Sequence, residues 1–287
     1  MASFTNFATL SYNGGTINSN TVTGEIMETV TADKTAVTQE YGAGETLNYV
    51  VSLVNSGPAA VTGLTVTDDL GAYEVGGLTL YPLAYRADTL QLFIDGVLQP
   101  APAVTAGPPL AVTGIDIPAG GSAVLVYETE VTAFAPLAPE SVITNTAVVT
   151  GGGLSVPLSV SATVGTEDHA ALSISKAVSP AVVAANGELT YSFEITNTGN
   201  TEAAAADAVV LSDTFDPILT GLSVSFNGQT WARGVNYSYD ETTGEFATLP
   251  GQITVPAAVY TQNADGTWAA EPGTAAVTIS GTIKSQS

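Results

Sequence analysis

KTAVTQEYGAGETLNYVVSLVNSG, residues Lys34–Gly57, has a counterpart later in the chain, KAVSPAVVAANGELTYSFEITNTG, residues Lys176–Gly199. The two stretches align without a gap, so that Tyr49 matches Tyr191 and Asn55 matches Asn197. In both, apolar and polar residues alternate with a period of two, which places successive side chains on opposite faces of a strand. The chain is therefore predicted to be a tandem repeat of strand-rich domains.

The rest of the chain follows the same pattern. Alternating runs such as GSAVLVYETEV and AAVTISGTI are separated by turn residues, and no segment shows a clear helical period. We expect an all-β fold made of two tandem Ig-like β-sandwich domains. The predicted boundaries give an N-terminal donor strand or hairpin segment at residues 1–27, domain 1 at residues 28–166 and domain 2 at residues 167–287.

The composition excludes several classes of function. The 287 residues include 5 Lys and Arg against 27 Asp and Glu, for a net charge of −22, and a nucleic-acid-binding surface needs a basic footprint. One histidine, no cysteine and no glycine-rich phosphate loop leave few routes to enzymatic turnover. We therefore expect no enzyme, no cofactor, no metal site and no nucleic-acid partner. No apolar run approaches the roughly 18 residues of a membrane span, so no membrane insertion is expected.

The two copies differ in completeness. After VYETEV the first copy continues through VITNTAVVTGGG and LSVPLSVSATV, whereas the second reaches VTISGTIKSQS and stops. The second domain is therefore predicted to lack its last strand. An unpaired sheet edge of this kind invites pairing with another chain.

The N-terminal segment resembles the part that domain 2 lacks. FTNFATLSYNGG, residues 4–15, is similar to ITNTAVVTGG, residues 143–152, and Asn6 matches Asn145. The segment could fold back onto its own second domain, or it could be a mobile tail. We favour its insertion into the second domain of the next molecule, because domain 1 stands between the segment and its own domain 2. Such a head-to-tail contact is heterologous and builds a filament, so the chain itself is the expected partner.

Strand parity also places polar residues on the apolar faces of both domains. Each domain has a lysine on its first strand, an aspartate in mid-domain and an asparagine on its last strand; these residues are Lys34, Asp68 and Asn145 for domain 1, and Lys176, Asp213 and the donated Asn6 for domain 2. Burial of such groups without partners costs several kcal/mol. A bulge would exchange Asp68 for Asp69.

These three residue types can form an isopeptide bond. Desolvation makes the lysine a neutral nucleophile, and a protonated aspartate can act as the catalytic proton shuttle. The predicted cross-links are Lys34 to Asn145 within a chain, with Asp68 as shuttle, and Lys176 to Asn6 between chains, with Asp213 as shuttle. A buried salt bridge with hydrogen bonds and no covalent bond is the alternative that the residues leave open.

The motifs NGELTYSFEITNTGN, VVLSDTF and ITNTAVVT resemble the conserved repeat domain of bacterial surface proteins catalogued as domain of unknown function number eleven. The resemblance implies Ig-like sandwiches in cell-envelope and spore-surface proteins, with no enzymatic turnover. Doubled copies in a chain of this size are also similar to clostridial spore appendage subunits. This resemblance implies that the protein forms an extracellular surface or spore appendage and is made without a cleaved signal peptide. It also implies anchor or tip proteins as further partners.

A monomeric adhesin or carbohydrate-binding module is the competing interpretation. Five aromatic residues fall in the longer loops of domain 2 and could stack on sugars, although packing is their commoner fate; they are Trp231, Tyr237, Tyr239, Tyr260 and Trp268. Two acidic turns, at residues 239–245 and 263–266, lack the spacing of a calcium loop and are predicted to be hairpin tips.

Overall fold

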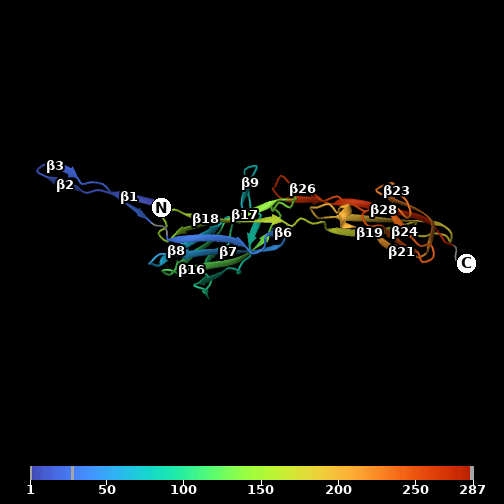
Figure 1. Cartoon of the computed structure of the whole chain (residues 1–287), viewed down its shortest axis with the longest axis horizontal. Coiled ribbons are helices and arrows are strands. Elements are labelled where there is room, and N and C mark those ends of the chain that lie inside the picture. Colours follow the sequence, from blue (N-terminus) through green and yellow to red (C-terminus); the bar gives the residue numbers. More distant parts are fainter. Residues whose placement is uncertain (1, 27–28, 285–287) are drawn as a thin grey trace. The chain divides into compact units, whose positions relative to one another are not determined.

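The computed structural model describes residues 2–26 and 29–284, and it confirms the predicted all-β fold (Figure 1). Antiparallel strands account for nearly all the regular structure, with one short 3-10 turn, η1 (Ala205–Asp207). No helix within these ranges is long and apolar enough to span a membrane. The boundary predicted between residues 27 and 28 lies outside the described residues.

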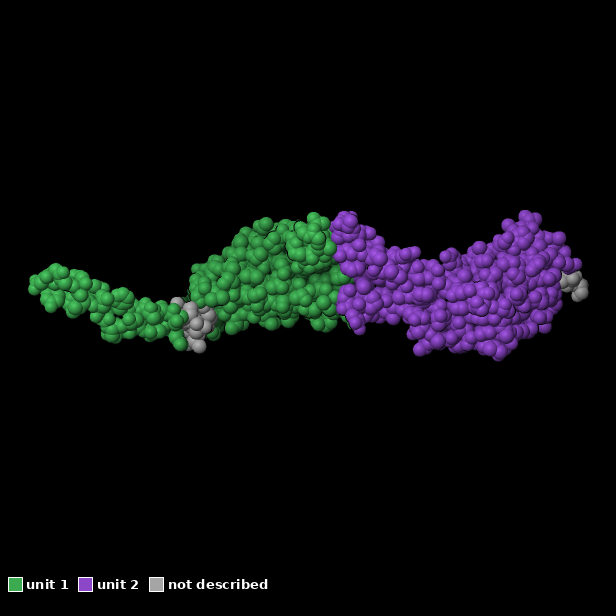
Figure 2. Space-filling view, turned by 90° about the horizontal axis from the view of Figure 1, so that it is seen from above, with its two compact units in different colours: residues 1–136, 142–165 green, residues 137–141, 166–287 purple. Residues whose placement is uncertain are grey.

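The chain divides into two compact units (Figure 2). Unit 1 comprises Met1–Pro136 and Val142–Gly165, and unit 2 comprises Leu137–Ser141 and Thr166–Ser287. Each unit has its own buried core of aliphatic and aromatic side chains.

Unit 1 is a sandwich of two antiparallel sheets. The first sheet has the order β13-β12-β16-β7-β5, with β11 also paired to β16. Its strands are β5 (Val30–Ala36), β7 (Thr46–Asn55), β11 (Leu83–Tyr85), β12 (Gln91–Ile94), β13 (Val97–Leu98) and β16 (Ser122–Val131). Every second residue of β7 from Leu47 to Leu53 is buried, as the alternating sequence predicts.

The second sheet of unit 1 has the order β14-β15-β8-β17-β18-β6. Its strands are β6 (Glu40–Tyr41), β8 (Val61–Asp68), β14 (Ala103–Thr105), β15 (Leu110–Ile117), β17 (Val142–Gly151) and β18 (Leu158–Thr166). A small separate hairpin joins β9 (Tyr73–Val75) to β10 (Leu78–Leu80). The central strand β8 is paired on both edges, to β15 on one side and to β17 on the other.

Unit 2 repeats the first sheet but only part of the second. The sheet β19-β20-β28-β22-β23 corresponds to the first sheet of unit 1, and the other sheet is β21-β25-β24. The strands are β19 (Leu172–Ser179), β20 (Glu188–Asn197), β21 (Ser212–Thr214), β22 (Leu219–Phe226), β23 (Gln229–Trp231), β24 (Tyr237–Tyr239), β25 (Glu245–Thr248) and β28 (Gly273–Ile283), with a hairpin of β26 (Val259–Gln262) and β27 (Trp268–Glu271). Among the described strands, none pairs with the free edge of β21.

The N-terminal segment forms a long two-part hairpin. Strand β1 (Ala2–Asn6) pairs with β4 (Val22–Ile26), and β2 (Thr9–Tyr12) pairs with β3 (Gly15–Asn18). Asn13 and Gly14, with φ of 48° and 79°, form the turn between β2 and β3. Positive φ at both positions is typical of the tight type I′ hairpin turn that an Asn-Gly pair favours.

Two matching asparagines close the same turn in both units. Asn55 and Asn197 are both fully buried at the ends of β7 and β20. The Asn55 side chain donates hydrogen bonds to the backbone oxygens of Ala59 and Pro118 and accepts one from the Gly57 N–H. These bonds satisfy buried backbone groups that would otherwise lack partners.

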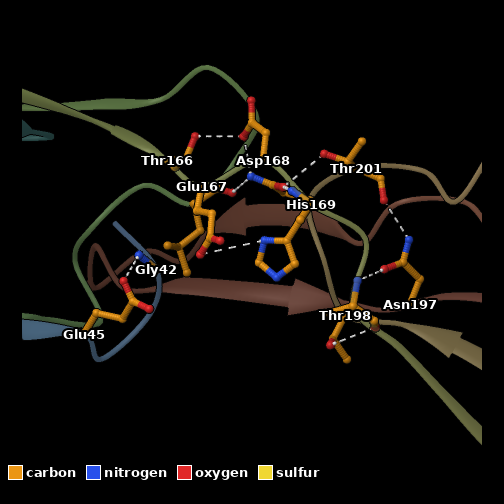
Figure 3. A network of polar contacts seen from close by, with 12 residues as sticks. Gly42, Glu45, Thr166, Glu167, Asp168, His169, Asn197, Thr198 and Thr201 are labelled. Carbon is orange, nitrogen blue, oxygen red and sulfur yellow. Dashed lines mark hydrogen bonds and ion pairs between the residues drawn. The ribbon is translucent and has the colours of Figure 1, made fainter. Parts of the chain in front are cut away.

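Asn197 makes the equivalent contacts in unit 2 (Figure 3). Its Nδ2 donates to the backbone oxygens of Thr201 and Pro256, at 2.8 and 3.0 Å. Its Oδ1 accepts hydrogen bonds from the N–H groups of Ala171 and Gly199, at 3.0 and 2.9 Å. One side chain therefore ties together three separate segments of unit 2.

Replacement of Asn197 by alanine should destabilise unit 2 by about 3 kcal/mol or more, because several buried backbone groups lose their only side-chain partner. Denaturant unfolding monitored by tryptophan fluorescence measures this, since Trp231 and Trp268 both lie in unit 2. Asn263→Ala is the matched control, because the Asn263 side chain is exposed. Equal losses in the two variants would contradict the structural role of Asn197.

Candidate cross-linking and assembly sites

A buried ion pair lies between the two sheets of unit 1. Lys34 on β5 and Asp68 at the end of β8 are joined by a 2.6 Å contact between Nζ and Oδ2, with side chains 0% and 2% exposed. The same carboxylate oxygen accepts a hydrogen bond from the Tyr127 hydroxyl on β16, and Oδ1 accepts one from the Leu70 N–H. The structure thus brings together two of the three residues predicted for this site.

The neighbouring aspartate is not part of this cluster. Asp69 Oδ1 accepts hydrogen bonds from the backbone N–H groups of Gly71 and Thr146, at 2.9 and 2.8 Å. It therefore holds the turn after β8, and Asp68 is the residue of the pair that points into the core.

The third predicted residue, Asn145 on β17, is fully buried in the same core. Strand β17 pairs with β8, with Ala147 opposite Asp68, and it also approaches β5 of the facing sheet to within 8 Å between Cα atoms. Neither Nδ2 nor Oδ1 of Asn145 has a hydrogen-bond partner. A buried carboxamide without partners costs several kcal/mol, so a noncovalent network that includes Asn145 is incomplete in this arrangement.

Burial controls the chemistry of the lysine. Desolvation lowers the pKa of Lys34 below its usual 10.5, and the attraction of Asp68 opposes this change without cancelling it. A lowered pKa increases the fraction of neutral amine, which is the nucleophilic form. Desolvation also raises the pKa of the Tyr49 and Tyr127 hydroxyls, and Asp68 adds to the rise in both.

Unit 2 contains the equivalent pair in an open setting. Lys176 Nζ lies 2.5 Å from Asp213 Oδ2, but the side chains are 42% and 16% exposed. The amine lies above the rings of Tyr191, Phe193 and Phe215, with 4.6 Å to the Tyr191 centroid. Lys176 was expected to be buried as Lys34 is; it remains half exposed because unit 2 has no described strand in the position that β17 occupies in unit 1.

Apolar side chains of unit 2 are exposed at the same position, which no described strand covers. Leu172, Ile174 and Val178 lie on the lysine-bearing face of β19 and are 40%, 56% and 44% exposed. A groove of about 340 Å³ opens between this strand and the segment that enters β21, lined by Leu172, Ile174 and Leu211 among others. An open apolar groove beside a free strand edge is a surface suited to an added strand.

The N-terminal hairpin shows the complementary exposure. Phe4 and Leu10 are 52% and 61% exposed, whereas their counterparts in unit 1, Ile143 and Val149, are 2% and 0% exposed. Asn6 is exposed on β1, and no described hydrogen bond joins its side chain to Lys176 or Asp213. The predicted pairing of Asn6 with Lys176 and Asp213 of another molecule stays a prediction.

The aromatic residues and acidic turns considered above for sugar and calcium binding make contacts within unit 2. Tyr237 and Tyr239 are buried in the core of unit 2, and Trp231 stacks on Phe226 with 5.0 Å between ring centroids. Asp240 and Asp265 each accept hydrogen bonds from a threonine two residues later, which lowers the pKa of both carboxyls. The described residues hold no group of three or more His, Cys, Asp or Glu that could bind a metal.

The sequence did not predict that Tyr49 and Tyr127 lie beside the candidate residues Asp68 and Asn145. Tyr127 contacts Asp68 directly, and the Asn145 side chain lies close enough to Tyr49 and Tyr127 to affect the pKa of both hydroxyls. The only signal in the sequence was the match of Tyr49 with Tyr191 in the repeat.

No protein-family model matches the chain, and no curated protein has significant sequence similarity to it. The chain is similar in structure to the major pilin subunit BcpA of Bacillus cereus, at 15% identity over 94% of this chain and 73% of that one, with a TM-score of 0.36. It is also similar to the pilus backbone protein RrgB from Streptococcus pneumoniae, at 14% identity over 85% and 55% of the two chains, with a TM-score of 0.34.

A third similar structure is the collagen-binding domain from a Staphylococcus aureus adhesin, at 14% identity over 50% of this chain and 99% of that one, with a TM-score of 0.29. At these values the similarity is one of general architecture. The function proposed for this chain therefore rests on its own residues.

The lowered pKa of Lys34 predicts that the free energy of unfolding depends on pH. The Asn145→Leu variant, which cannot form an isopeptide bond with Lys34, is the chain in which to measure it. Between the lowered folded pKa and the usual 10.5, the unfolded chain binds more protons than the folded chain, so stability rises with pH. Denaturant unfolding between about pH 7 and about pH 8.5, below the range of tyrosine ionisation, should show a rise of at most about 1.4 kcal/mol per pH unit. Addition of Lys34→Met should remove the rise; the same slope in both variants would contradict the assignment.

Proposed function

We propose that the protein is a structural subunit that polymerises head to tail, each N-terminal hairpin completing unit 2 of the next molecule. One observation carries this proposal: β17 is buried and paired on both edges in unit 1, whereas its N-terminal counterpart is exposed and no described strand pairs with the free edge of β21. Burial of each large apolar side chain of the hairpin contributes about 1.5–3 kcal/mol.

Unit 1 supplies the register of the proposed contact. There Ala147 lies opposite Asp68, Val148 opposite Thr67 and Val149 opposite Val66. Transfer of this pairing to the matching residues of the hairpin and of unit 2 places Ala8 opposite Asp213. It also places Thr9 opposite Ser212 and Leu10 opposite Leu211, so that the apolar face of the hairpin covers the exposed groove.

The proposal extends to covalent stabilisation. Within each chain, Lys34 is joined to Asn145 with Asp68 as the proton shuttle. Between chains, Lys176 is joined to Asn6 of the neighbour with Asp213 in the same role. The buried Lys34–Asp68 pair and the unpartnered Asn145 carboxamide support the first bond. The equivalent Lys176–Asp213 pair, open on the side where the hairpin would dock, supports the second.

The resulting filament fits an extracellular or spore-surface appendage. The resemblance of the repeat to surface and spore-appendage domains supports this location, with anchor or tip proteins as additional partners. The protein has no turnover in this role, because each bond forms once and consumes its own residues.

A cysteine pair tests the assembly in a chain that has no native cysteine. Directly opposed residues of antiparallel strands have Cα atoms about 4.5–5.5 Å apart, which is within the range for a disulfide. Thr9→Cys with Ser212→Cys, in a Lys176→Arg background that blocks the isopeptide bond between chains, should therefore give multimers that a reductant dissolves. Non-reducing denaturing electrophoresis measures this.

Two controls accompany this experiment. Thr5→Cys with Ser212→Cys should give few multimers, because Thr5 lies four residues before Thr9 in the N-terminal segment and is therefore out of register with Ser212. Deletion of residues 2–24 should abolish fibres in electron micrographs. A disulfide confined to single chains would instead show that the hairpin folds back onto its own unit 2, and fibres that persist after the deletion would contradict strand donation.

Intact mass and denaturing electrophoresis test the two bonds separately. The natural chain should give a ladder after boiling in detergent and reductant, and each bond should remove one ammonia. Lys176→Arg and Asn6→Ala should each lose the ladder but retain fibres and the internal loss of one ammonia, and Asn145→Leu should retain the ladder and lose only the internal bond. Lys284→Arg, at the third lysine, is the control and should change nothing. A single band at full mass would exclude both bonds.

A further inference from the structure

The hydroxyl of Tyr49 has no partner in the structure. Tyr49 lies in the middle of β7, its side chain is fully buried, and its hydroxyl makes no hydrogen bond. By contrast, the hydroxyl of Tyr41, another fully buried tyrosine of unit 1, donates to the backbone oxygen of Pro136 at 2.6 Å. A buried polar group without a partner is rare and calls for a specific explanation.

The unpartnered hydroxyl lies beside an unpartnered carboxamide. No partner meets standard hydrogen-bond geometry at Asn145, yet its side chain lies near enough to Tyr49 to act on the hydroxyl as a weak hydrogen-bond partner, which lowers the pKa of the hydroxyl against the larger effect of burial. The two groups are thus buried neighbours, and no hydrogen bond of standard geometry joins them. This geometry leaves a donor available for an oxygen atom that moves or gains charge during a reaction.

The same tyrosine is retained where the surrounding side chains change. In unit 1 the Lys34 amine lies 5.1 Å from the Tyr49 ring centroid, and in unit 2 the Lys176 amine lies 4.6 Å from that of Tyr191. The residue paired with each tyrosine differs, because Tyr127 lies opposite Tyr49 and Ile279 lies opposite Tyr191. Retention of tyrosine beside both lysines, with its partner replaced, indicates a role shared by the two sites.

We propose that Tyr49, and Tyr191 in unit 2, supply the hydrogen bond that stabilises the developing oxyanion when the lysine attacks the asparagine carboxamide. This inference rests on the proposed isopeptide chemistry and assigns a role to a residue that this chemistry did not include. Tyr127, which is hydrogen-bonded to Asp68, acts only as a positioning residue for that carboxylate.

The reaction balances without any further reagent. The neutral Nζ of Lys34 attacks Cγ of Asn145, and the carbonyl electrons move onto Oδ1, which accepts the hydrogen bond from the Tyr49 hydroxyl. Asp68, which enters the step protonated, delivers its proton to Nδ2 and takes one from the attacking nitrogen. The C–N bond to Nδ2 then breaks, the carbonyl re-forms, and one amide and one ammonia result. Tyr49 keeps its proton throughout, which its raised pKa favours.

The rate of bond formation in unit 1 tests this role. Full-length chains are synthesised in a short isotopic pulse and sampled at intervals, and intact mass gives the fraction that has lost ammonia. Loss of one oxyanion donor slows acyl transfer by about 100-fold or more, so Tyr49→Phe should slow the reaction by about that factor. Tyr41→Phe, which removes a buried hydroxyl elsewhere in unit 1, should leave the rate unchanged.

A stability measurement separates chemistry from packing. In the Asn145→Leu background, where no bond can form, Tyr49→Phe should leave the unfolding midpoint unchanged or raise it, because it removes an unsatisfied buried group. A slower reaction together with undiminished stability is the expected signature. A slowing no greater than that of Tyr41→Phe, or one explained by an equal loss of stability, would overturn the proposal.

The rate at which the bond between chains forms is an independent test of the role of the tyrosine. Full-length Lys176→Arg chains can only donate Asn6 and full-length Asn6→Ala chains can only offer Lys176, so covalent dimers arise only after the two are mixed in denaturant and diluted. Tyr191→Phe in the accepting chain should slow dimer formation by about 100-fold, and Tyr260→Phe, whose hydroxyl bonds to Thr198, should not. If the parent pair forms no dimer, the proposed cross-link itself fails; if it does and Tyr191→Phe forms dimers at the parent rate, only the role of the tyrosine fails.

Discussion

The pairing of β17 with β8 is the constraint on which the rest of the structure depends. It closes the second sheet of unit 1, places Asn145 in the core and seals Lys34 and Asp68 from water. In unit 2, where no described strand makes the corresponding pairing, the equivalent lysine is half exposed and an apolar groove remains open. Completion of this sheet and desolvation of the lysine therefore go together in unit 1.

The alternation of apolar and polar residues was sufficient to predict the fold class and the inward direction of Lys34 and Asn145. Parity assigns a face to each residue, and the confirmed sandwich has only two inner faces to bring together. Parity could not decide between Asp68 and Asp69, because that choice depends on the backbone at the end of β8. The structure resolves it through the hydrogen bonds of Asp69 to Gly71 and Thr146.

The sequence alone could not predict the contacts that depend on strand register. Tyr127 contacts Asp68 because the register of β16 against β7 places Tyr127 opposite Tyr49, and nothing in the local pattern of VLVYETEV specifies that register. The exposure of Lys176 follows from the edge of β21 that no described strand covers, and the aromatic surroundings of Lys176 were not predicted from the sequence. Phe193 and Phe215 take the places of Val51 and Leu70, so unit 2 fills its core with rings where unit 1 uses smaller side chains.

The positions of Lys34 and Asn145 also have a mechanical consequence. Lys34 lies on the strand through which the chain enters the sandwich of unit 1, and Asn145 lies on the hairpin through which it leaves. A covalent link between these two elements would carry a pulling force directly from entry to exit, so the sheets between them would bear little load. The same link between Lys176 and a donated Asn6 would continue that path into the next molecule. A fibre built in this way would yield by stretching its short linkers, while its domains stayed folded under tension.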